Sequence, residues 1–237
     1  MEPGNDLPQD DRLFRRSAAV KEALVAMIAA AALTATASAQ NASDPAAPDY
    51  AVLARASGTP EIPGLKVIWL APWGDPAKAN TWRNIVVHQT EGPAGSARAG
   101  AMAQAKNPTR RGVTVWVETD GTVYWSVPEH AVPTHGDGAN RNDNRYIDNK
   151  PTYRQVLKDN SIGVEFSGNF PDVARPATQA QVAAWRILVN LLMARYDIPR
   201  ERVYAHNWID YKDARYCEGC DLATLARSPQ FRPQPGR

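Results

Sequence analysis

Two hydrophobic runs along the chain each end in a histidine. Residues 83–90 pass from an apolar run into His88 and are followed by a Gly-Pro pair, and residues 203–206 repeat the pattern with His206. A short apolar run bounded by turn residues is typical of a buried strand. The pattern therefore predicts two strands that each carry an imidazole at the C-terminal end, although a single histidine in such a place is most often an ordinary hydrogen-bonded residue.

Four further strands are predicted from alternating and β-branched segments. The first is expected at an edge of the sheet, and an Asp-Gly pair between the next two predicts a hairpin turn. These strands are residues 67–70, 112–119, 122–127 and 161–168.

Three segments have the periodicity and the end signals of helices. Residues 94–106 are rich in alanine and are closed by an Asn-Pro pair. Residues 178–196 begin with a capping box of Thr178 and Gln181 and carry one apolar stripe, and a short helix is expected over residues 221–226. Strands interleaved with helices predict an α/β fold, a single domain with a central mixed β-sheet flanked by helices.

The N-terminal part of the chain has the order of a secretory signal. Basic residues precede an apolar segment, residues 23–33, and the sequence Ala-Ser-Ala that ends at Ala39 fits the small-residue rule for cleavage. The basic residues are Arg12, Arg15, Arg16 and Lys21. The alternatives are an alanine-rich helix packed on the domain and a membrane anchor, but the apolar segment is too short to span a bilayer comfortably. We therefore expect residues 1–39 to be a signal peptide with an N-terminal extension, removed from an exported protein that is periplasmic or secreted and has no stable membrane insertion.

Composition and charge restrict the remaining part of the chain. Residues 40–60 are rich in small and polar residues and are expected to form a flexible leader before a domain over residues 61–237. The chain of 237 residues is 43% hydrophobic and 22% charged, as soluble globular proteins are. Its net charge of +2 is too small for the basic surface of a nucleic-acid-binding protein, so no nucleic-acid partner is expected.

The candidate chemistry lies at the two histidine strands and at a cysteine that follows them. His88, His206 and Cys217 would supply two imidazoles and a thiolate, the three-ligand set of a catalytic zinc ion, which keeps a fourth position for water. Two alternatives use the same cysteine. Cys217 and Cys220 are close enough in sequence for a structural disulfide, which is common in exported proteins. Cys217 as nucleophile with His206 as base would suit a thiol hydrolase.

Three more polar residues are candidates for the site. Glu165 lies among apolar neighbours of a predicted strand, and a buried carboxylate needs a partner or a catalytic task. Thr90 and His135 are expected to line the cleft, and each would equally suit a structural hydrogen-bonding role. His135 lies in the segment 128–160, which has no periodic pattern and is expected to be a long loop.

Six short motifs occur in the order found in the zinc-dependent N-acetylmuramoyl-L-alanine amidases. They lie at residues 86–90, 120–124, 135–136, 161–165, 205–208 and 215–219. Over about residues 65–227 the chain resembles the amidase-2 group of these enzymes, which shares its fold with peptidoglycan recognition proteins. The resemblance implies a peptidoglycan recognition protein-like fold and peptidoglycan or a muropeptide as substrate. It also implies a zinc ion that activates water to cleave the amide bond between N-acetylmuramic acid and L-alanine of the stem peptide.

The resemblance implies roles for individual residues as well. The zinc ligands of the family correspond to His88, His206 and Cys217. Its general base corresponds to Glu165, and the cation that stabilises the oxyanion corresponds to Arg215. Two departures from the family pattern stand out. Val113 and Thr114 replace an aromatic residue and a histidine, so a tyrosine-assisted variant of the mechanism is not expected, and Glu218 stands where a proline is common.

A non-catalytic recognition module of the same fold, which binds muramyl peptides without cutting them, is the main alternative in another functional class. Such modules usually lack a zinc ligand, whereas all three predicted ligands are present in this chain. The sequence therefore favours the amidase.

The order of the basic, apolar and small-residue sections predicts where the mature chain begins. N-terminal sequencing of the exported protein is expected to start at Gln40, because a signal peptidase cleaves after the last small residue of the pattern. A mature chain that still carries residues 23–33 would contradict the signal-peptide interpretation.

Overall fold

The structure is a computed structural model that describes residues 48–136, 152–210 and 216–232. The chain divides into two units, Met1–Asp44 and Pro45–Arg237. The predicted signal peptide lies outside the described residues and stays a prediction. The folded domain described below belongs to the second unit.

A mixed sheet of six strands forms the centre of this domain, in the order β1-β4-β3-β5-β2-β6. The strands are β1 (Val67–Trp69), β2 (Asn84–Gln89), β3 (Val115–Val117), β4 (Val123–Trp125), β5 (Ser161–Phe166) and β6 (Val203–Ala205). β3 and β4 form the predicted antiparallel hairpin, and the other neighbouring pairs are parallel. The strand 67–70 was expected at an edge, and β1 lies there.

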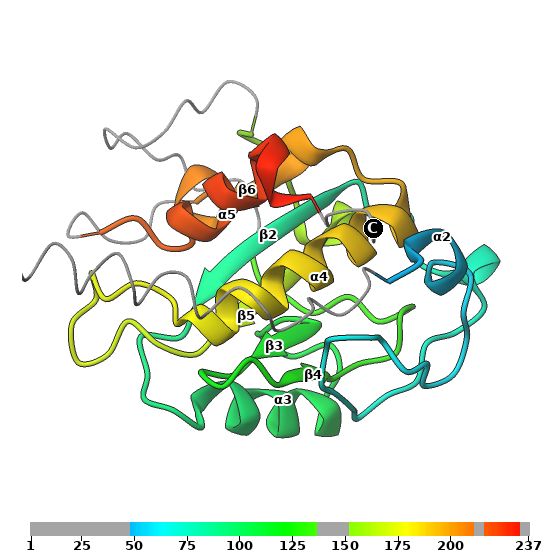
Figure 1. Cartoon of the computed structure of the whole chain (residues 1–237), viewed down its shortest axis with the longest axis horizontal. Coiled ribbons are helices and arrows are strands. Elements are labelled where there is room, and N and C mark those ends of the chain that lie inside the picture. The colour runs from blue at the N-terminus through cyan, green and yellow to red at the C-terminus, as the bar shows by residue number, and fades with distance from the viewer. Residues whose placement is uncertain (1–47, 137–151, 211–215, 233–237) are drawn as a thin grey trace, which may run out of the picture. The chain divides into compact units, whose positions relative to one another are not determined.

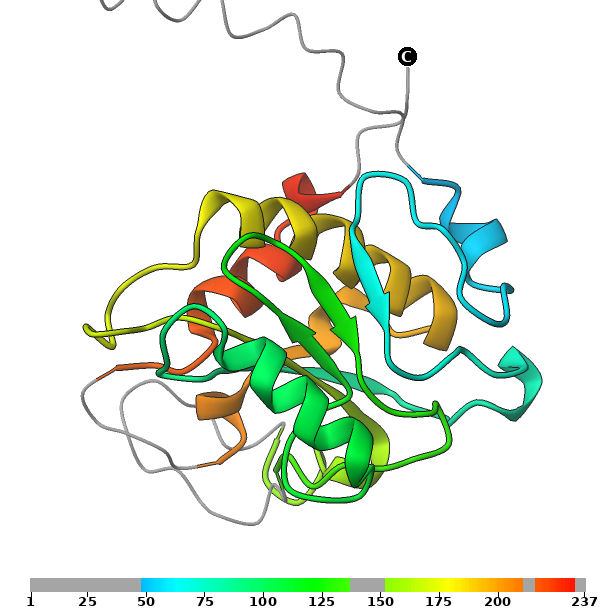
Figure 2. The same ribbon diagram turned by 90° about the horizontal axis from the view of Figure 1, so that it is seen from below.

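Helices cover both faces of the sheet. The described helices are α2 (Tyr50–Leu53), α3 (Ser96–Lys106), α4 (Gln179–Tyr196) and α5 (Cys220–Arg227). α3 lies on one side of the sheet and α4 and α5 lie on the other (Figures 1 and 2). The predicted α/β fold with a flanked mixed sheet is confirmed. None of the described helices combines the length and the apolar character needed to cross a membrane.

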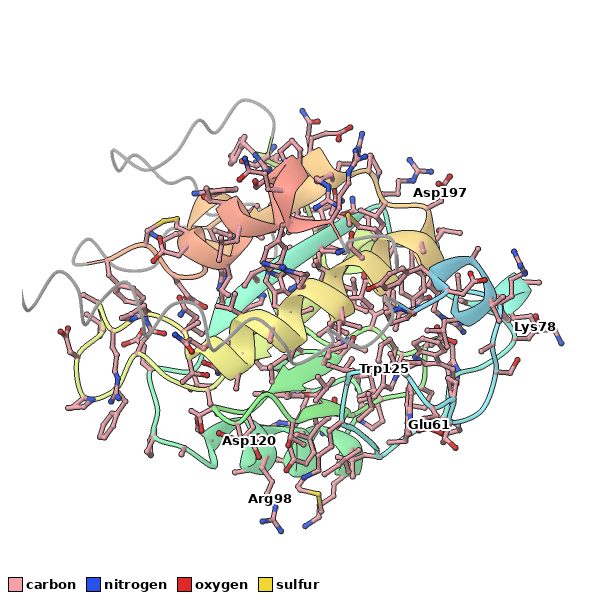
Figure 3. All side chains as sticks on the ribbon, viewed as in Figure 1. Glu61, Lys78, Arg98, Asp120, Trp125 and Asp197 are labelled. Atoms are coloured by element: carbon pink, nitrogen blue, oxygen red, sulfur yellow. A yellow bond between two sulfur atoms is a disulfide. The ribbon has the colours of Figure 1, made fainter. Side chains whose placement is uncertain are left out.

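Alternation along the strands divides the buried side chains between one large core and two small ones. The larger core joins Ile85 and Val87 of β2 to Trp185 of α4 and Leu222 of α5. Trp125 of β4 belongs to this larger core and lies inside the fold. The other side chains labelled in Figure 3 are charged and exposed, and they point outward. Because side chains of a strand alternate between faces, His88 points to the opposite side from Val87, away from α4 and α5.

One of the two small cores lies under α3, and the other joins Val86 of β2 to Val156 and Ile209. α3 packs on β3 and β4, where Ala97 and Ala101 meet Trp116. Gly100 allows this contact, because a Cβ atom there would lie 2.3 Å from the ring of Trp116. The ends of β2 and β5 on the same face border a pocket instead, and that pocket contains the candidate site.

One predicted element end is observed and one differs. Thr178 and Gln181 form the predicted capping box at the start of α4, with hydrogen bonds of 3.0 and 3.1 Å. The strand expected to end in His206 stops at Ala205, and His206 begins a short 3₁₀ turn. In this turn the carbonyl of His206 accepts the backbone N–H of Ile209 at 3.0 Å.

Part of the predicted flexible leader is ordered in the domain. Residues 50–53 form helix α2, capped by the carboxylate of Asp49, and Tyr50 and Leu53 pack against the larger core. Tyr50 and Leu53 of the expected leader therefore belong to the folded part of the chain. The segment is mostly small and polar, so its sequence does not reveal that Tyr50 and Leu53 pack against the larger core.

A buried ion pair holds this N-terminal segment to α4. Arg195 pairs with Glu129, with 2.6 Å between Nη2 and Oε2. The same guanidinium donates to the carbonyls of Ala54 and Ala56 at 3.0 and 2.9 Å, and to that of Gly74 at 3.2 Å. One side chain therefore donates to a carboxylate and to three carbonyl groups, and it joins the N-terminal segment to α4.

Replacing Arg195 by leucine is expected to lower the free energy of unfolding by about 3–5 kcal/mol, because it leaves the carboxylate of Glu129 buried without its cation. Urea denaturation of the described domain measures the loss. The matched control is Arg186→Leu, on the same helix but exposed, which should remain close to the wild type. Equal stability of the two variants would contradict a structural role for the ion pair.

Candidate metal centre

The candidate site forms where parallel strands end on the same face of the sheet. His88 of β2 is the register partner of Glu165 of β5, and paired residues of neighbouring strands point to the same face. His206 follows directly after β6, the other neighbour of β2. Ligand sites of open α/β sheets form at the carboxyl ends of the strands. A pocket of about 220 Å³ lies there, lined by all three of these residues.

Two histidines and a glutamate meet in this pocket. The Oε1 atom of Glu218 lies 3.1 Å from Nδ1 of His206 and 3.5 Å from Nδ1 of His88. All three side chains are buried, and one ligand atom of each lies within 4.8 Å of the others. Two imidazoles and one carboxylate form a ligand set of catalytic zinc sites, so the residues present fit a zinc ion.

A glycine brings Glu218 to the end of β2. Gly219 has a φ of +80°, and a Cβ atom there would lie 2.3 Å from the carbonyl oxygen of Val87. Its backbone N–H donates to the side chain of Gln89 at 2.8 Å, and the backbone N–H of Gln89 donates to Glu218 at 3.3 Å. The close approach of the two backbones therefore requires glycine and fixes the carboxylate beside His88.

The third member of the candidate ligand set differs from the sequence prediction. Cys217 forms a disulfide with Cys220, with 5.5 Å between their Cα atoms. A disulfide sulfur is not a thiolate, and metal binding by cysteine requires the thiolate. Glu218, enclosed between the two cysteines in sequence, therefore replaces Cys217 in the candidate ligand set. The thiol hydrolase alternative loses its nucleophile for the same reason.

Burial sets the charges of the group. It lowers the pKa of His88 to about 3, helped by the proximity of His206 and opposed by Glu218, so the imidazole is neutral at pH 7. Burial also raises the pKa of Glu218, but the hydrogen bond and the charge of His206, with those of His88, outweigh it and hold this pKa well below its usual range. The group therefore offers a carboxylate anion together with a neutral imidazole, and neutral imidazole is the form that binds metal.

Glu165 lies next to the group without belonging to it. The residue is half-buried, lines the pocket, and has register partners His88 on one side and Trp116 on the other. A carboxylate at this position reaches the same space as the two histidines. The expectation that this strand carboxylate has a task beyond solvation agrees with its position.

The two residues expected to contact substrate lie at the pocket but make structural contacts as well. The hydroxyl of Thr90 lies 2.9 Å from that of Ser96 at the start of α3 and accepts the backbone N–H of Gly92 at 3.1 Å. His135 is buried, and its Nδ1 lies 3.2 Å from Nε2 of His88. Burial lowers the pKa of His135 to about 4, against the opposing effect of a hydrogen bond to the backbone of Ser161.

The predicted cation of the site, Arg215, lies outside the described residues. Among the described residues that line the pocket, Arg111 is the cationic one, and its side chain is exposed. Sequence reasoning missed it because Arg111 follows another arginine in a loop, where an exposed charge has no distinguishing pattern. Asp210 was also missed, although its spacing of four residues from His206 is a usable signal: the two side chains lie 3.6 Å apart.

The comparisons with known proteins agree with the resemblance found in the sequence. A family model described as N-acetylmuramoyl-L-alanine amidase matches residues 78–220, more than half of the chain. The matched range contains His88, His206 and Glu218. A search among curated proteins finds no match.

Several solved structures are similar to this chain at low identity. A mutant endolysin from Bacillus subtilis is 21% identical, with 69% of this chain and 97% of that chain covered and a TM-score of 0.43. The catalytic domain of XlyA is 23% identical, with 63% and 86% covered and a TM-score of 0.42. The N-acetylmuramoyl-L-alanine amidase LysC from Clostridium intestinale URNW is 18% identical, with 65% and 87% covered and a TM-score of 0.41. Similarity at this level does not assign roles to residues.

Proposed function

Because the chain belongs to the N-acetylmuramoyl-L-alanine amidase family and is therefore a peptidoglycan amidase, we propose that it cuts its substrate in the pocket at the ends of β2 and β5, with a zinc ion held by His88, His206 and Glu218. The bond cleaved is the amide between N-acetylmuramic acid and L-alanine. The observation that carries the proposal is the buried group of two imidazoles and one carboxylate beside Glu165.

The ligand set supports zinc as the metal. Catalytic zinc sites use three protein ligands and leave a fourth position open, and two histidines with one glutamate are among their known ligand sets. Zinc in such a site generates a strong nucleophile from water at neutral pH and polarises a carbonyl oxygen. The carboxylate of Glu218 would balance one of the two positive charges of a bound zinc ion.

Glu165 is the proposed general base. Amide hydrolysis needs a group that accepts a proton from the attacking water and returns it to the leaving amine of L-alanine. A half-buried carboxylate that is the register partner of His88 stands within the same pocket as the three ligands. This position supports proton transfer by Glu165, whereas Glu218 is engaged by both histidines.

A cation is proposed to steady the negative charge on the former carbonyl oxygen. The family resemblance gives this role to Arg215, and Arg111 is a second candidate because it lines the described pocket. Loss of one such donor typically raises the barrier by about 3–4 kcal/mol. Thr90 and Arg111, on the exposed side of the pocket, are proposed to contact the substrate.

Export is part of the proposal. A peptidoglycan amidase acts on the cell wall, and residues 1–39 have the order of a signal peptide. We therefore propose a periplasmic or secreted enzyme. The Cys217–Cys220 disulfide is consistent with an oxidising compartment.

The bond that is cut is tested by mass spectrometry of purified peptidoglycan after digestion. The wild type is expected to release stem peptides that begin with L-alanine. Glu165→Gln should keep zinc at wild-type stoichiometry and lose at least about a hundredfold in rate, because the amide keeps the shape of the side chain and accepts no proton from water. Release of peptides that begin elsewhere, or a Glu165→Gln variant near the wild-type rate, would contradict the proposal.

The identity of the third ligand is tested by zinc content of non-reduced variants. Glu218→Ala is expected to lose zinc, because only two imidazoles remain to hold the ion. Cys217→Ser is the matched neighbour and should retain it, since the serine removes the disulfide but leaves the carboxylate. Retention of zinc by Glu218→Ala together with its loss from Cys217→Ser would return the ligand role to the cysteine.

A further inference from the structure

A second and larger pocket lies next to the metal pocket at the end of β2. This side pocket has a volume of about 630 Å³ and is bordered by residues 169–177, by Val182 of α4 and by α5 (Figure 1). We propose that the side pocket binds the stem peptide of the substrate, beyond the alanine whose amide bond is cut. The inference deepens the proposed function and rests on its catalytic pocket.

The metal pocket is too small for the whole substrate. Its volume of about 220 Å³ is below the range of about 300–1,000 Å³ that is usual for pockets of small ligands. An N-acetylmuramoyl peptide is larger than most such ligands, so the metal pocket can enclose only the groups around the scissile amide. The rest of the substrate must lie on neighbouring surface.

Three connections join the two pockets. Gln89, the last residue of β2, lines both of them. Tyr216 lines the side pocket and donates its hydroxyl proton to the carboxylate of Glu91, which lines the metal pocket. Cys217 lines the side pocket, and the next residue, Glu218, lines the metal pocket. A chain that leaves the metal pocket over Gln89 therefore enters the side pocket directly.

The walls of the side pocket are largely aliphatic. Val182 of α4 faces it together with Leu222 and Leu225 of α5, and Pro176 borders it on the loop. Leu225 is exposed although it is apolar. Such walls suit the aliphatic side chains of a peptide, because contact with them removes apolar surface from water on both sides.

Asn169 offers an acceptor for a peptide N–H group. Its side chain is buried and lines the side pocket, and its Nδ2 group donates to the carbonyl of Val173 at 2.6 Å. Its Oδ1 atom has no hydrogen-bond partner among the residues that the structure describes. A buried acceptor left without a donor is unfavourable, and a backbone N–H of a bound peptide would supply that donor.

Charged groups at the side pocket favour the peptide over the glycan as its occupant. Arg175 and Asp221 line the pocket and are exposed. The carboxyl group of muramic acid is used in the amide bond, whereas the stem peptide keeps free carboxylates. One hydrogen bond from Nη1 of Arg175 to the carbonyl of Phe170, at 3.3 Å, leaves other N–H groups of the guanidinium for a carboxylate. Asp221 is the matching acceptor for an amino group of the peptide.

The first test combines Arg175→Ala with two substrates, an N-acetylmuramoyl tetrapeptide and the same compound with its peptide carboxylates amidated. The wild type is expected to prefer the free acid by about tenfold in kcat/KM, because the amide loses a charge-assisted hydrogen bond. In Arg175→Ala this preference should fall to about one. Arg55→Ala is the control, because Arg55 is exposed and lines neither pocket, and it should keep the wild-type preference.

The second test fills the side pocket with Thr224→Trp, at an exposed position of α5 that lines it. The wild type should cut the tetrapeptide at least about tenfold better in kcat/KM than N-acetylmuramoyl-L-alanine, because contacts remote from the reacting bond contribute to catalysis. Thr224→Trp should lose most of this preference, whereas Arg186→Trp, at an exposed position of α4 outside both pockets, should keep it. Zinc content and melting temperature check that each variant is folded.

The outcomes separate the inference from the proposed function. A wild type that cuts N-acetylmuramoyl-L-alanine as well as the tetrapeptide would overturn the inference while the proposed function stands. Wild-type preferences in both Arg175→Ala and Thr224→Trp would do the same. A Thr224→Trp variant that is slower on long glycan strands but keeps its preference for the tetrapeptide would assign the side pocket to the glycan instead. A wild type that cuts neither compound nor purified peptidoglycan would overturn the proposed function, and the inference with it.

Discussion

The site depends on a buried carboxylate that two imidazoles share. A carboxylate removed from water costs several kcal/mol unless charges or hydrogen bonds compensate it. Glu218 finds this compensation where His88 and His206 meet, and its Oε1 atom lies within 3.5 Å of both rings. The loop that carries Glu218 approaches β2 so closely that only glycine fits at position 219. The burial of one charge therefore fixes the loop, the histidines and the composition of the proposed metal site together.

The sheet supplies the frame for this interaction. Parallel pairing sets His88 beside Glu165, and α3 covers β3 and β4 on that face while the pocket forms over the ends of β2 and β5. The opposite face is filled by α4 and α5, so the strands that carry the site rest on the larger core. Strands β2 and β5 thus hold His88 and the proposed base Glu165, and the more exposed Thr90 and Arg111 border the space left for substrate.

The sequence predicts most of the fold because its signals are local. The apolar run before His88, the Asp-Gly hairpin and the capping box at Thr178 each specify their own element. The ligand set was only partly predictable. Whether Cys217 is a thiolate or half of a disulfide depends on Cys220 in space, and the carboxylate between the two cysteines has no periodic pattern of its own. The contact of His135 with His88 joins residues 47 positions apart and follows only from the fold.

Zinc K-edge X-ray absorption of the non-reduced wild-type protein tests the central claim, a carboxylate as the third ligand, most directly. The account predicts a first shell of nitrogen and oxygen atoms alone, at about 2.0–2.2 Å from the metal. A sulfur atom at about 2.3 Å would show that the cysteine binds zinc and would contradict the account.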